Sequence, residues 1–402
     1  MLFKNMNTKT VGTGLLIAGT AIGAGMLSLP LSVGVGGLIG ASFVMLLGFF
    51  YMLSTFFLLL EILCYQEDTM SLSGLSKQYL GFWGEVISTG GFLCLLYLAS
   101  AAYINGATDL IGAYLPFTTD ISNLQMAFTL MIGLICSYGV RWIELLNRLL
   151  MILLITSFIC LVYSIAPHAS IGDNLIGEPS FLIRTAPIAA FSFTSHIILP
   201  SIIPYLKHHV QNIKTAMVLG SLIPLTFYII WIFLIVLLLP FNGENSLMSI
   251  AGLKSGQLSA LSNVIETNYH IPSLRLLNDC FAFFAIITSF LGVTISVSDT
   301  ISDTLNITHR SVSIFLTLLP PFIIALLKPA GFTSILNYGG IFIAVIYGIL
   351  PARIAWIARY HLNQKSLYTL PTGKIGLLLM AVFAILIILI VLLNDQGWLP
   401  HP

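Results

Sequence analysis

The chain contains a group of glycines inside an apolar segment long enough to cross a bilayer. The stretch IAGTAIGAGMLSLP, residues 17–30, includes Gly19, Gly23 and Gly25. Glycine is a weak helix former, and a broken helix leaves unpaired N–H groups at one new end and unpaired C=O groups at the other. Within a bilayer such groups are tolerated only where they line a cavity. The segment therefore predicts a broken membrane helix with a binding site at the break.

A second apolar segment, residues 185–206, is also interrupted. It reads TAPIAAFSFTSHIILPSIIPYL, and the centre, Phe191–His196, is aromatic, hydroxylic and ionisable, with prolines on both sides. The N–H end of a break suits a carboxylate, and the C=O end suits an ammonium group or a cation. An α-amino acid carries a carboxylate and an ammonium group on one carbon. Two breaks that meet in mid-membrane are therefore matched to an amino acid.

A structural alternative exists for the glycines. Gly19-x-x-x-Gly23 and Gly36-x-x-x-Gly40 both fit the small-residue motif by which membrane helices pack closely. The first segment alone does not show whether its glycines serve helix packing or substrate binding. The second break, in the corresponding place of the second half of the chain, favours a transporter site.

The composition restricts the class of protein. Of 402 residues, 57% are hydrophobic and 8% are charged, which is typical of a polytopic membrane protein. The net charge of +1 suggests no nucleic-acid partner. The five cysteines form no Cys-x-x-Cys or Cys/His cluster, so neither a disulfide framework nor a metal site is expected, and no cofactor is expected. The first apolar segment is too long for a signal peptide and is interpreted as a retained membrane helix.

Apolar segments of about 20 residues predict membrane spans. Eleven are expected, at 10–36, 38–63, 86–114, 125–141, 146–166, 185–206, 214–240, 273–301, 311–328, 332–358 and 374–394. The polar connection 241–272 is expected to lie outside the membrane and to include a surface helix. We expect one transmembrane domain, with an inverted repeat of five plus five spans (about 10–166 and 185–358) and an extra helix at about 374–394.

The positions of the basic residues predict the orientation. With a cytoplasmic N-terminus and eleven spans, twelve of the sixteen lysines and arginines lie on the cytoplasmic side. Basic residues favour the cytoplasmic side of short loops. We therefore expect a multi-pass protein of the bacterial cytoplasmic (inner) membrane, with its C-terminus in the periplasm. The oligomeric state is not predicted.

Four motifs together resemble a known family. LLIAGTAIGAGMLSLPL (residues 15–31), HIILPSI (196–202), GSLIPLTFYIIW (220–231) and TSFLGVTISVSDTISD (288–303) are similar to the bacterial hydroxy/aromatic amino acid permeases, and to the tyrosine-specific members in particular. The resemblance extends over nearly the whole chain. It implies an all-α fold of the leucine-transporter type and uptake of an aromatic or hydroxy amino acid with a cation, usually a proton. Where family members commonly have Phe-Gly-Phe-His-Gly, this chain has FTSHI, with His196 retained.

The substrate-site candidates lie mainly at the two breaks. Backbone donors at the first break are expected to bind the carboxylate, and the second break to supply acceptors and a wall, including an aromatic ring that stacks on the substrate. The resemblance adds the third span, which lines the site in folds of this type; there, hydrogen bonding between helices is the alternative role. The candidates are Thr20, Gly23, Ala24, Gly25, Tyr103, Asn105, Phe191, Ser192, Phe193, Thr194 and Ser195.

A second set of residues is a candidate for ion coupling. His196 is ionisable inside a broken span and is expected either to carry a proton or to donate one structural hydrogen bond. The resemblance places Thr288 and Ser289 where such folds hold hydroxyl ligands for sodium. Asp299 and Asp303 lie one helical turn apart and form either a proton or gating site or pairs with basic loop residues. We expect Glu61 and Asp109, near span ends, to be hydrated or paired.

These residues favour a secondary transporter over two other classes. The expected function is proton-driven import of an aromatic amino acid, first of all tyrosine. The alternatives are sodium coupling or a broader specificity for tryptophan, serine or threonine. A passive channel would show repeated selectivity loops or charge rings, and an enzyme would show a nucleophile or metal motif. The sequence has neither feature, and we expect no enzymatic activity.

Overall fold

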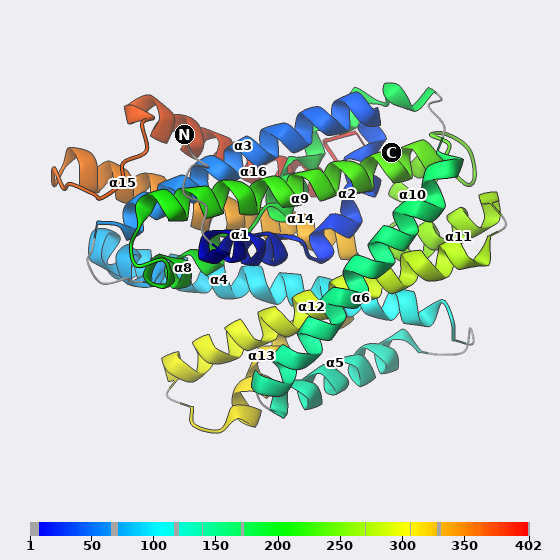
Figure 1. The fold of residues 1–402 in the computed structure, drawn as a ribbon, viewed down its shortest axis with the longest axis horizontal. Helices are drawn as coiled ribbons and strands as arrows, with labels where there is room; N and C mark the ends of the chain where they lie inside the picture. Colours follow the sequence, from blue (N-terminus) through cyan, green and yellow to red (C-terminus); the bar gives the residue numbers. More distant parts are fainter. Residues whose placement is uncertain are drawn as a thin grey trace.

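The computed structural model describes residues 8–65, 71–115, 120–138, 140–169, 173–269, 271–305, 307–327 and 331–400. Within these ranges all regular secondary structure is helical (Figure 1). Among the residues that the structure describes, nine helical segments are long and apolar enough to cross a membrane, and α5 (Ile121–Ser137) is a shorter apolar helix. The all-α membrane architecture predicted from the sequence is therefore confirmed. The number eleven stays a prediction, because α1 (Thr8–Ala21) and α5 are shorter than a full span.

The first predicted break is present. Helix α1 ends at Ala21, Gly23 is fully extended with φ −142° and ψ −164°, and a 3₁₀ segment, η1, runs from Ala24 to Ser28. A short helix, α2 (Leu29–Ser32), and a second 3₁₀ segment, η2 (Gly34–Gly36), follow before α3 (Gly37–Leu63) begins. Figure 1 shows this dark-blue segment in the middle of the molecule, which places the break away from both surfaces of the bundle.

The second break forms without glycine. Helix α7 (Ala186–Ser192) ends at Ser192, residues 193–195 are not helical, and η7 (His196–Ile198) leads into α8 (Leu199–Tyr205). Pro200 lies at the start of α8, where a missing N–H costs no hydrogen bond. Prolines on either side and hydroxyl side chains that bond back to the chain thus end the helix without a glycine.

Two groups of helices meet at these breaks. The first packs α1 along α9 (Val210–Leu238), with α3 and α7 beside them. The second packs together α4 (Leu72–Gly112), α5, α6 (Val140–Ile165), α12 (Pro272–Leu305) and α13 (Arg310–Leu327). Figure 1 shows α9 and α3 above α1, and α12, α13, α5 and α6 below it. The site is therefore positioned between the two groups.

The remaining helices connect and cover the two groups. Helix α14 (Phe332–Ile343) contacts both α4 and α7, and a π-helical segment, η8 (Ala344–Ile349), joins it to α15 (Leu350–Tyr360). The last helix, α16 (Gly373–Asp395), packs on η8, α14 and α15. The polar connection after α9 contains two helices, α10 (Leu247–Ala251) and α11 (Gln257–Tyr269), in place of the single surface helix expected. The short 3₁₀ segments η3–η6 lie at Ala166–His168, Asp173–Leu175, Pro179–Phe181 and Ile183–Thr185.

The glycines divide between packing and binding. A Cβ on Gly220 would lie 2.4 Å from the Ile17 Cβ, so close contact of α1 with α9 requires glycine there. Gly36 and Gly40 both accommodate the Leu182 side chain. Gly19, in contrast, has only the end of one methionine side chain near it, and it lines a cavity. The packing interpretation therefore fits Gly36 and Gly40, and the cavity interpretation fits Gly19 and Gly23.

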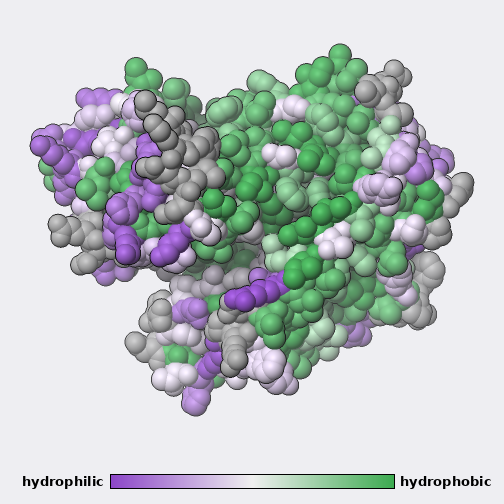
Figure 2. Space-filling view, viewed as in Figure 1, coloured by the Kyte–Doolittle hydropathy of each residue, from purple (hydrophilic) through white to green (hydrophobic). Residues whose placement is uncertain are grey.

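The outer surface is suited to lipid. Large apolar side chains on α3, α6 and α16 are exposed, among them Phe43, Ile152 and Leu378. Figure 2 shows a broad apolar surface with hydrophilic residues gathered toward the left and right ends of the view. These two polar ends and the apolar surface between them are the pattern of a multi-pass membrane protein.

Candidate substrate site

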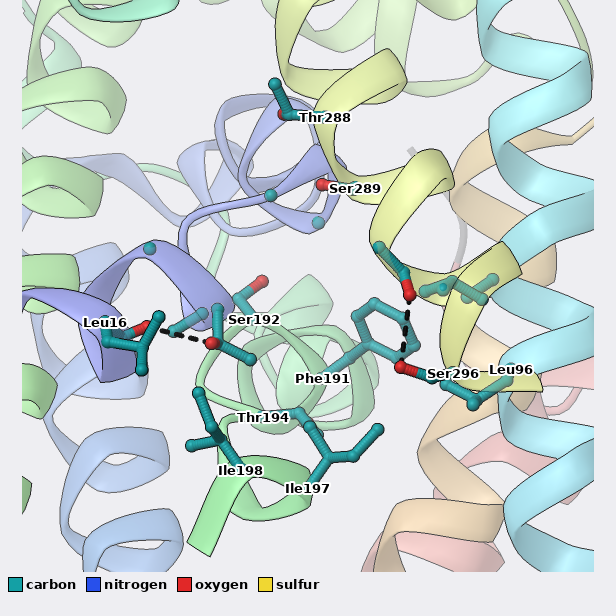
Figure 3. Close-up of a pocket in the computed structure, with 18 of the residues that line it drawn as sticks. Leu16, Leu96, Phe191, Ser192, Thr194, Ile197, Ile198, Thr288, Ser289 and Ser296 are labelled. Carbon is teal, nitrogen blue, oxygen red and sulfur yellow. Dashed lines mark hydrogen bonds between the residues drawn. The ribbon is translucent and has the colours of Figure 1, made fainter. Parts of the chain in front are cut away.

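A cavity of about 550 Å³ lies where the two breaks meet. Its volume is within the roughly 300–1,000 Å³ that small-molecule sites occupy. It is lined from α1 and its break, α4, α6, the second break, α8, α12 and η8. Figure 3 labels lining side chains from α1, α4, the second break and α12. The cavity reaches back along α1 as far as Leu15 and Leu16, and Figure 2 shows the surface hollowed at the left, the end where α1 begins.

The first break supplies backbone donors. The first hydrogen bond of η1 runs from the Met26 N–H to the Gly23 C=O, at 3.1 Å. The N–H groups of Ala24 and Gly25 precede that bond, as the first donors of any helix do. Thr20 lines the cavity beside them, with its hydroxyl donating to the Leu16 C=O at 2.8 Å (Figure 3). The N–H groups of Ala24 and Gly25 are therefore the backbone donors left without an intrahelical partner at the first break.

The second break supplies part of the cavity wall. Phe191, Ser192 and Thr194 line the cavity, whereas Phe193 and Ser195 are buried outside it. Five consecutive residues were expected to contribute, and the structure brings three of them to the cavity. The Ser192 and Thr194 hydroxyls donate to carbonyls one turn earlier, at 3.0 and 3.4 Å.

Two glycines fix the Phe191 ring. A Cβ on Gly25 would lie 3.2 Å from the ring, and a Cβ on Gly339 would lie 2.8 Å from it. The ring is therefore held between η1 and α14 with one side on the cavity. Of the two phenylalanines predicted to stack on an aromatic substrate, Phe191 has the position to do so. Phe193 packs edge-on against Phe49 and Tyr228, with ring centroids 5.8 and 5.2 Å apart.

The two candidates on α4 have different positions. Tyr103 lines the cavity, and its hydroxyl hydrogen bonds Ser289. Asn105 is buried away from the cavity lining, where its Oδ1 accepts a bond from Gln125 Nε2 at 2.8 Å. Asn105 thus has the interhelical role stated as the alternative, and Tyr103 has the position of a substrate contact.

Thr288 and Ser289 lie on α12 beside the first break, as Figure 3 shows. Both line the cavity, and a Cβ on Gly23 would lie 2.5 Å from the Ser289 Oγ. The Ser289 hydroxyl donates to the Ala285 C=O at 2.9 Å, and the Thr288 hydroxyl donates to the Phe284 C=O at 2.9 Å. The Ser289 hydroxyl oxygen therefore lies against the first break, and Thr288 lines the same cavity; their role as sodium ligands stays a prediction.

His196 is buried behind the cavity. It is 1% exposed, and its Nε2 lies 3.0 Å from the Thr55 Oγ1 on α3. Its ring stacks on Tyr347 of η8 and lies against Phe56, with centroid separations of 4.4 and 4.8 Å. Tyr347 lines the cavity, and so it separates His196 from the open space.

The acidic residues divide between the surface and buried networks. Asp299 is exposed on α12, and the Asp303 side chain lies outside the described residues. Glu61 is buried and accepts bonds from Arg359 Nε at 2.6 Å, Tyr65 at 2.7 Å and the Leu370 N–H at 2.8 Å.

Asp109 belongs to a second buried network. It accepts bonds from the N–H groups of Leu258 and Ser259 at the start of α11, at 3.1 and 3.2 Å. Both Glu61 and Asp109 are therefore paired, which is one of the two roles expected for them.

The sequence interpretation missed several lining residues. Tyr347 lies in a π-helical segment, and such segments are frequent at functional sites. Asn147 and Met151 on α6, Ser201 on α8 and Ser296 on α12 also line the cavity. A hydroxyl or amide in an otherwise apolar span was the available signal for Asn147 and Ser296.

Comparisons with known proteins agree with this geometry. The model of the tryptophan/tyrosine permease family matches residues 6–391. The chain is 32% identical to tyrosine-specific transport system 1 of Haemophilus influenzae, over 98% of each chain. It is 28% identical to the tryptophan-specific transport protein of Pseudomonas aeruginosa, over 97% of this chain and 96% of that one. It is also 28% identical to glutamine transporter 2 of Aliivibrio fischeri, over 96% and 99%.

A solved structure has the same fold. An inward-facing conformation of Mhp1 superposes with a TM-score of 0.63, covering 96% of this chain and 91% of that one at 14% identity. The chain therefore has the leucine-transporter-type fold expected from its motifs.

Proposed function

Because the chain belongs to the tryptophan/tyrosine permease family, we propose that it is a secondary active symporter that imports tyrosine across the bacterial cytoplasmic membrane, driven by a proton gradient. It is a transporter and not an enzyme. Tyrosine is chosen because two relatives at 32% and 31% identity are tyrosine-specific systems. Tryptophan and smaller amino acids are the competing substrates, since tryptophan and glutamine transporters are also relatives.

The observation that carries the proposal is the cavity at the two breaks. Gly23 and Gly25 line this cavity at the start of η1, where the first backbone N–H groups have no intrahelical partner, and the rings of Tyr103, Phe191 and Tyr347 are part of its wall. Apolar rings with a few fixed polar groups are the usual lining of a small-molecule site. An aromatic amino acid would place its carboxylate on η1 and its ring against Phe191.

Two coupling ions have support in the structure. His196 is the one histidine in the described membrane segments that is both buried and next to a cavity-lining residue, which favours a proton. The Thr288 and Ser289 hydroxyls beside Gly23 favour the alternative, a sodium ion held by hydroxyl and carbonyl oxygens. We retain proton coupling as the proposal and sodium coupling as the second candidate.

We also propose that the N-terminus is cytoplasmic. The count of lysines and arginines supports this orientation. The cavity then extends from the first break toward the cytoplasm, because it reaches back along α1 as far as Leu15 and Leu16. In this orientation α11 and Asp109 lie on the periplasmic side.

The test is uptake of labelled tyrosine into proteoliposomes. We expect accumulation under an inward proton gradient in sodium-free buffer, with competition strongest from aromatic amino acids. A sodium gradient with the pH gradient collapsed separates the two coupling ions. Absence of uptake of every aromatic or hydroxy amino acid under both gradients contradicts the proposed function.

A further inference from the structure

One tyrosine hydroxyl joins the two breaks. Tyr228 of α9 is completely buried, and its hydroxyl oxygen lies 2.7 Å from the Ala21 carbonyl oxygen and 2.6 Å from the Ser192 carbonyl oxygen. Ala21 is the last residue of α1, and Ser192 is the last residue of α7. The C-terminal ends of both half-helices therefore converge on a single atom of an unbroken helix.

Two helix C-termini at one point require a positive partner. The last carbonyls of a helix lack intrahelical donors and carry partial negative charge, so two converging ends repel each other. A buried pair of such carbonyls is satisfied by a cation or by hydrogen-bond donors. A phenol has one proton, so at any moment Tyr228 donates to one carbonyl and only contacts the other through oxygen.

The position of this hydroxyl is fixed from several sides. Helix α9 contacts α1 closely at Gly220, two turns before Tyr228. The Tyr228 ring packs edge-on against Phe193, which follows the end of α7 directly. This contact also accounts for Phe193 facing away from the cavity. The hydroxyl is thus held at the junction by α1, α9 and the second break together.

We propose that the Tyr228 hydroxyl takes the place of a coordinated cation between the two breaks and thereby sets the geometry of the substrate site. Ala21 is two residues before Gly23, and Ser192 is a cavity-lining residue, so a change in their separation alters both the anion end and the wall of the cavity. Without the hydroxyl, the two carbonyls form a vacant site for a small monovalent cation. Tyr228 is a positioning residue, since it acts through the carbonyls and does not line the cavity.

The test compares Tyr228→Phe with Tyr51→Phe. Tyr51 on α3 is also buried, at 8% exposure, and its hydroxyl has no hydrogen-bond partner within the described part of the chain, so Tyr51→Phe controls for loss of a buried phenol oxygen. Two quantities are measured in purified protein: the Kd for labelled tyrosine and the melting temperature without substrate. Each is measured in sodium, lithium and choline chloride.

In choline chloride we expect Tyr228→Phe to bind tyrosine about tenfold more weakly than wild type, the effect of roughly one hydrogen bond. Sodium or lithium should restore affinity and raise the melting temperature by more than in wild type or Tyr51→Phe. The thermal measurement needs no substrate, so it decides the inference even if the proposed function, on which the affinity measurement rests, is wrong.

Two results overturn the inference. One is a Tyr228→Phe protein with wild-type affinity and melting temperature in choline chloride. The other is a loss of tyrosine affinity and of melting temperature in Tyr228→Phe that neither sodium nor lithium reverses. The hydroxyl would then be an ordinary hydrogen-bonding group. If the variant is unstable when purified, the same comparison is made by expression and uptake in intact cells in sodium and choline media. If Tyr228→Phe fails to fold in both media while Tyr51→Phe folds, that result also contradicts the inference.

Discussion

His196 stacks on Tyr347 with 4.4 Å between ring centroids and 26° between ring planes. The histidine is buried and the tyrosine lines the cavity. The Tyr347 ring therefore contacts both the His196 ring and the cavity. The ring belongs to a π-helical segment, Ala344–Ile349, and such segments are frequent at functional sites.

The first prediction concerns proton coupling. Glutamine at position 196 keeps an amide able to bond Thr55 but removes the titratable ring. We expect His196→Gln to lose gradient-driven accumulation of tyrosine while counterflow exchange continues. His309→Gln, at an exposed histidine, is the control and should behave as wild type. Undiminished accumulation by His196→Gln would show that His196 is not the proton carrier.

The second prediction concerns the first break. A Cβ at position 23 would lie 2.5 Å from the Ser289 Oγ, so Gly23→Ala must move α12 or the break. We expect tyrosine affinity to fall about tenfold or more, which is about 1.4 kcal/mol. Adding Ser289→Ala removes the clashing oxygen and should recover most of the affinity.

The control for this variant lies on α1, before the break. A Cβ at Gly12 meets nothing within 4 Å, and Gly12→Ala should leave affinity unchanged. A double variant no better than Gly23→Ala alone would mean that the contact with Ser289 is not what requires glycine there.

The third prediction concerns the aromatic wall. Gly339→Ala would place a Cβ 2.8 Å from the Phe191 ring, and the ring can move only toward Gly25 or the cavity. We expect KM for tyrosine to rise several-fold, since stacking of two aromatic rings contributes about 0.5–1.5 kcal/mol. Gly90→Ala, with open space around it, is the control. An unchanged KM for Gly339→Ala would show that Phe191 does not contact the substrate.

The fourth prediction concerns stability. Glu61 and Arg359 form a buried ion pair that also holds the Leu370 N–H and C=O. Removing one partner of a buried pair costs about 3–5 kcal/mol because the other charge is left unpaired. Glu61→Gln should therefore lower the melting temperature markedly, and Glu61→Gln combined with Arg359→Gln should lower it by less than the sum of the single variants.

An exposed ion pair is the comparison for this variant. Lys77 and Glu85 lie 3.0 Å apart at the surface, where an ion pair contributes about 0–1 kcal/mol. Lys77→Gln should leave the melting temperature nearly unchanged. Equal effects of Lys77→Gln and Glu61→Gln would contradict the special importance of the buried pair.

Much of the fold was predictable, because hydropathy determines where the membrane spans lie and the backbone chemistry of glycine and proline determines where they break. The predicted spans coincide with helices to within a few residues at most ends; α4 is the main exception, since it starts at Leu72 where a span from residue 86 was expected. The break after Ala21 follows from Gly23, and the break after Ser192 follows from prolines and hydroxyl side chains. A helix boundary of this kind depends on residues close to it in the chain, and these can be read from the sequence.

The orientation of side chains at the second break was not predictable. Residues 193–195 are not helical, so no period of 3.6 relates them to their neighbours. The sequence therefore did not separate Thr194, which lines the cavity, from Phe193 and Ser195, which do not. Tyr228 was missed for a different reason: a single tyrosine in an apolar helix is typical of packing, and its role exists only where three helices meet.

The pair of Glu61 and Arg359 also has a consequence for biosynthesis. The two residues are 298 positions apart in the chain. At about 5–20 residues per second, the ribosome adds Arg359 roughly 15–60 s after Glu61. During that interval the carboxylate at the end of α3 has no guanidinium partner, and it can stay hydrated because it lies near the end of its helix. Burial of Glu61 therefore follows insertion of α15, so the bundle closes at this end only after most of the chain has entered the membrane.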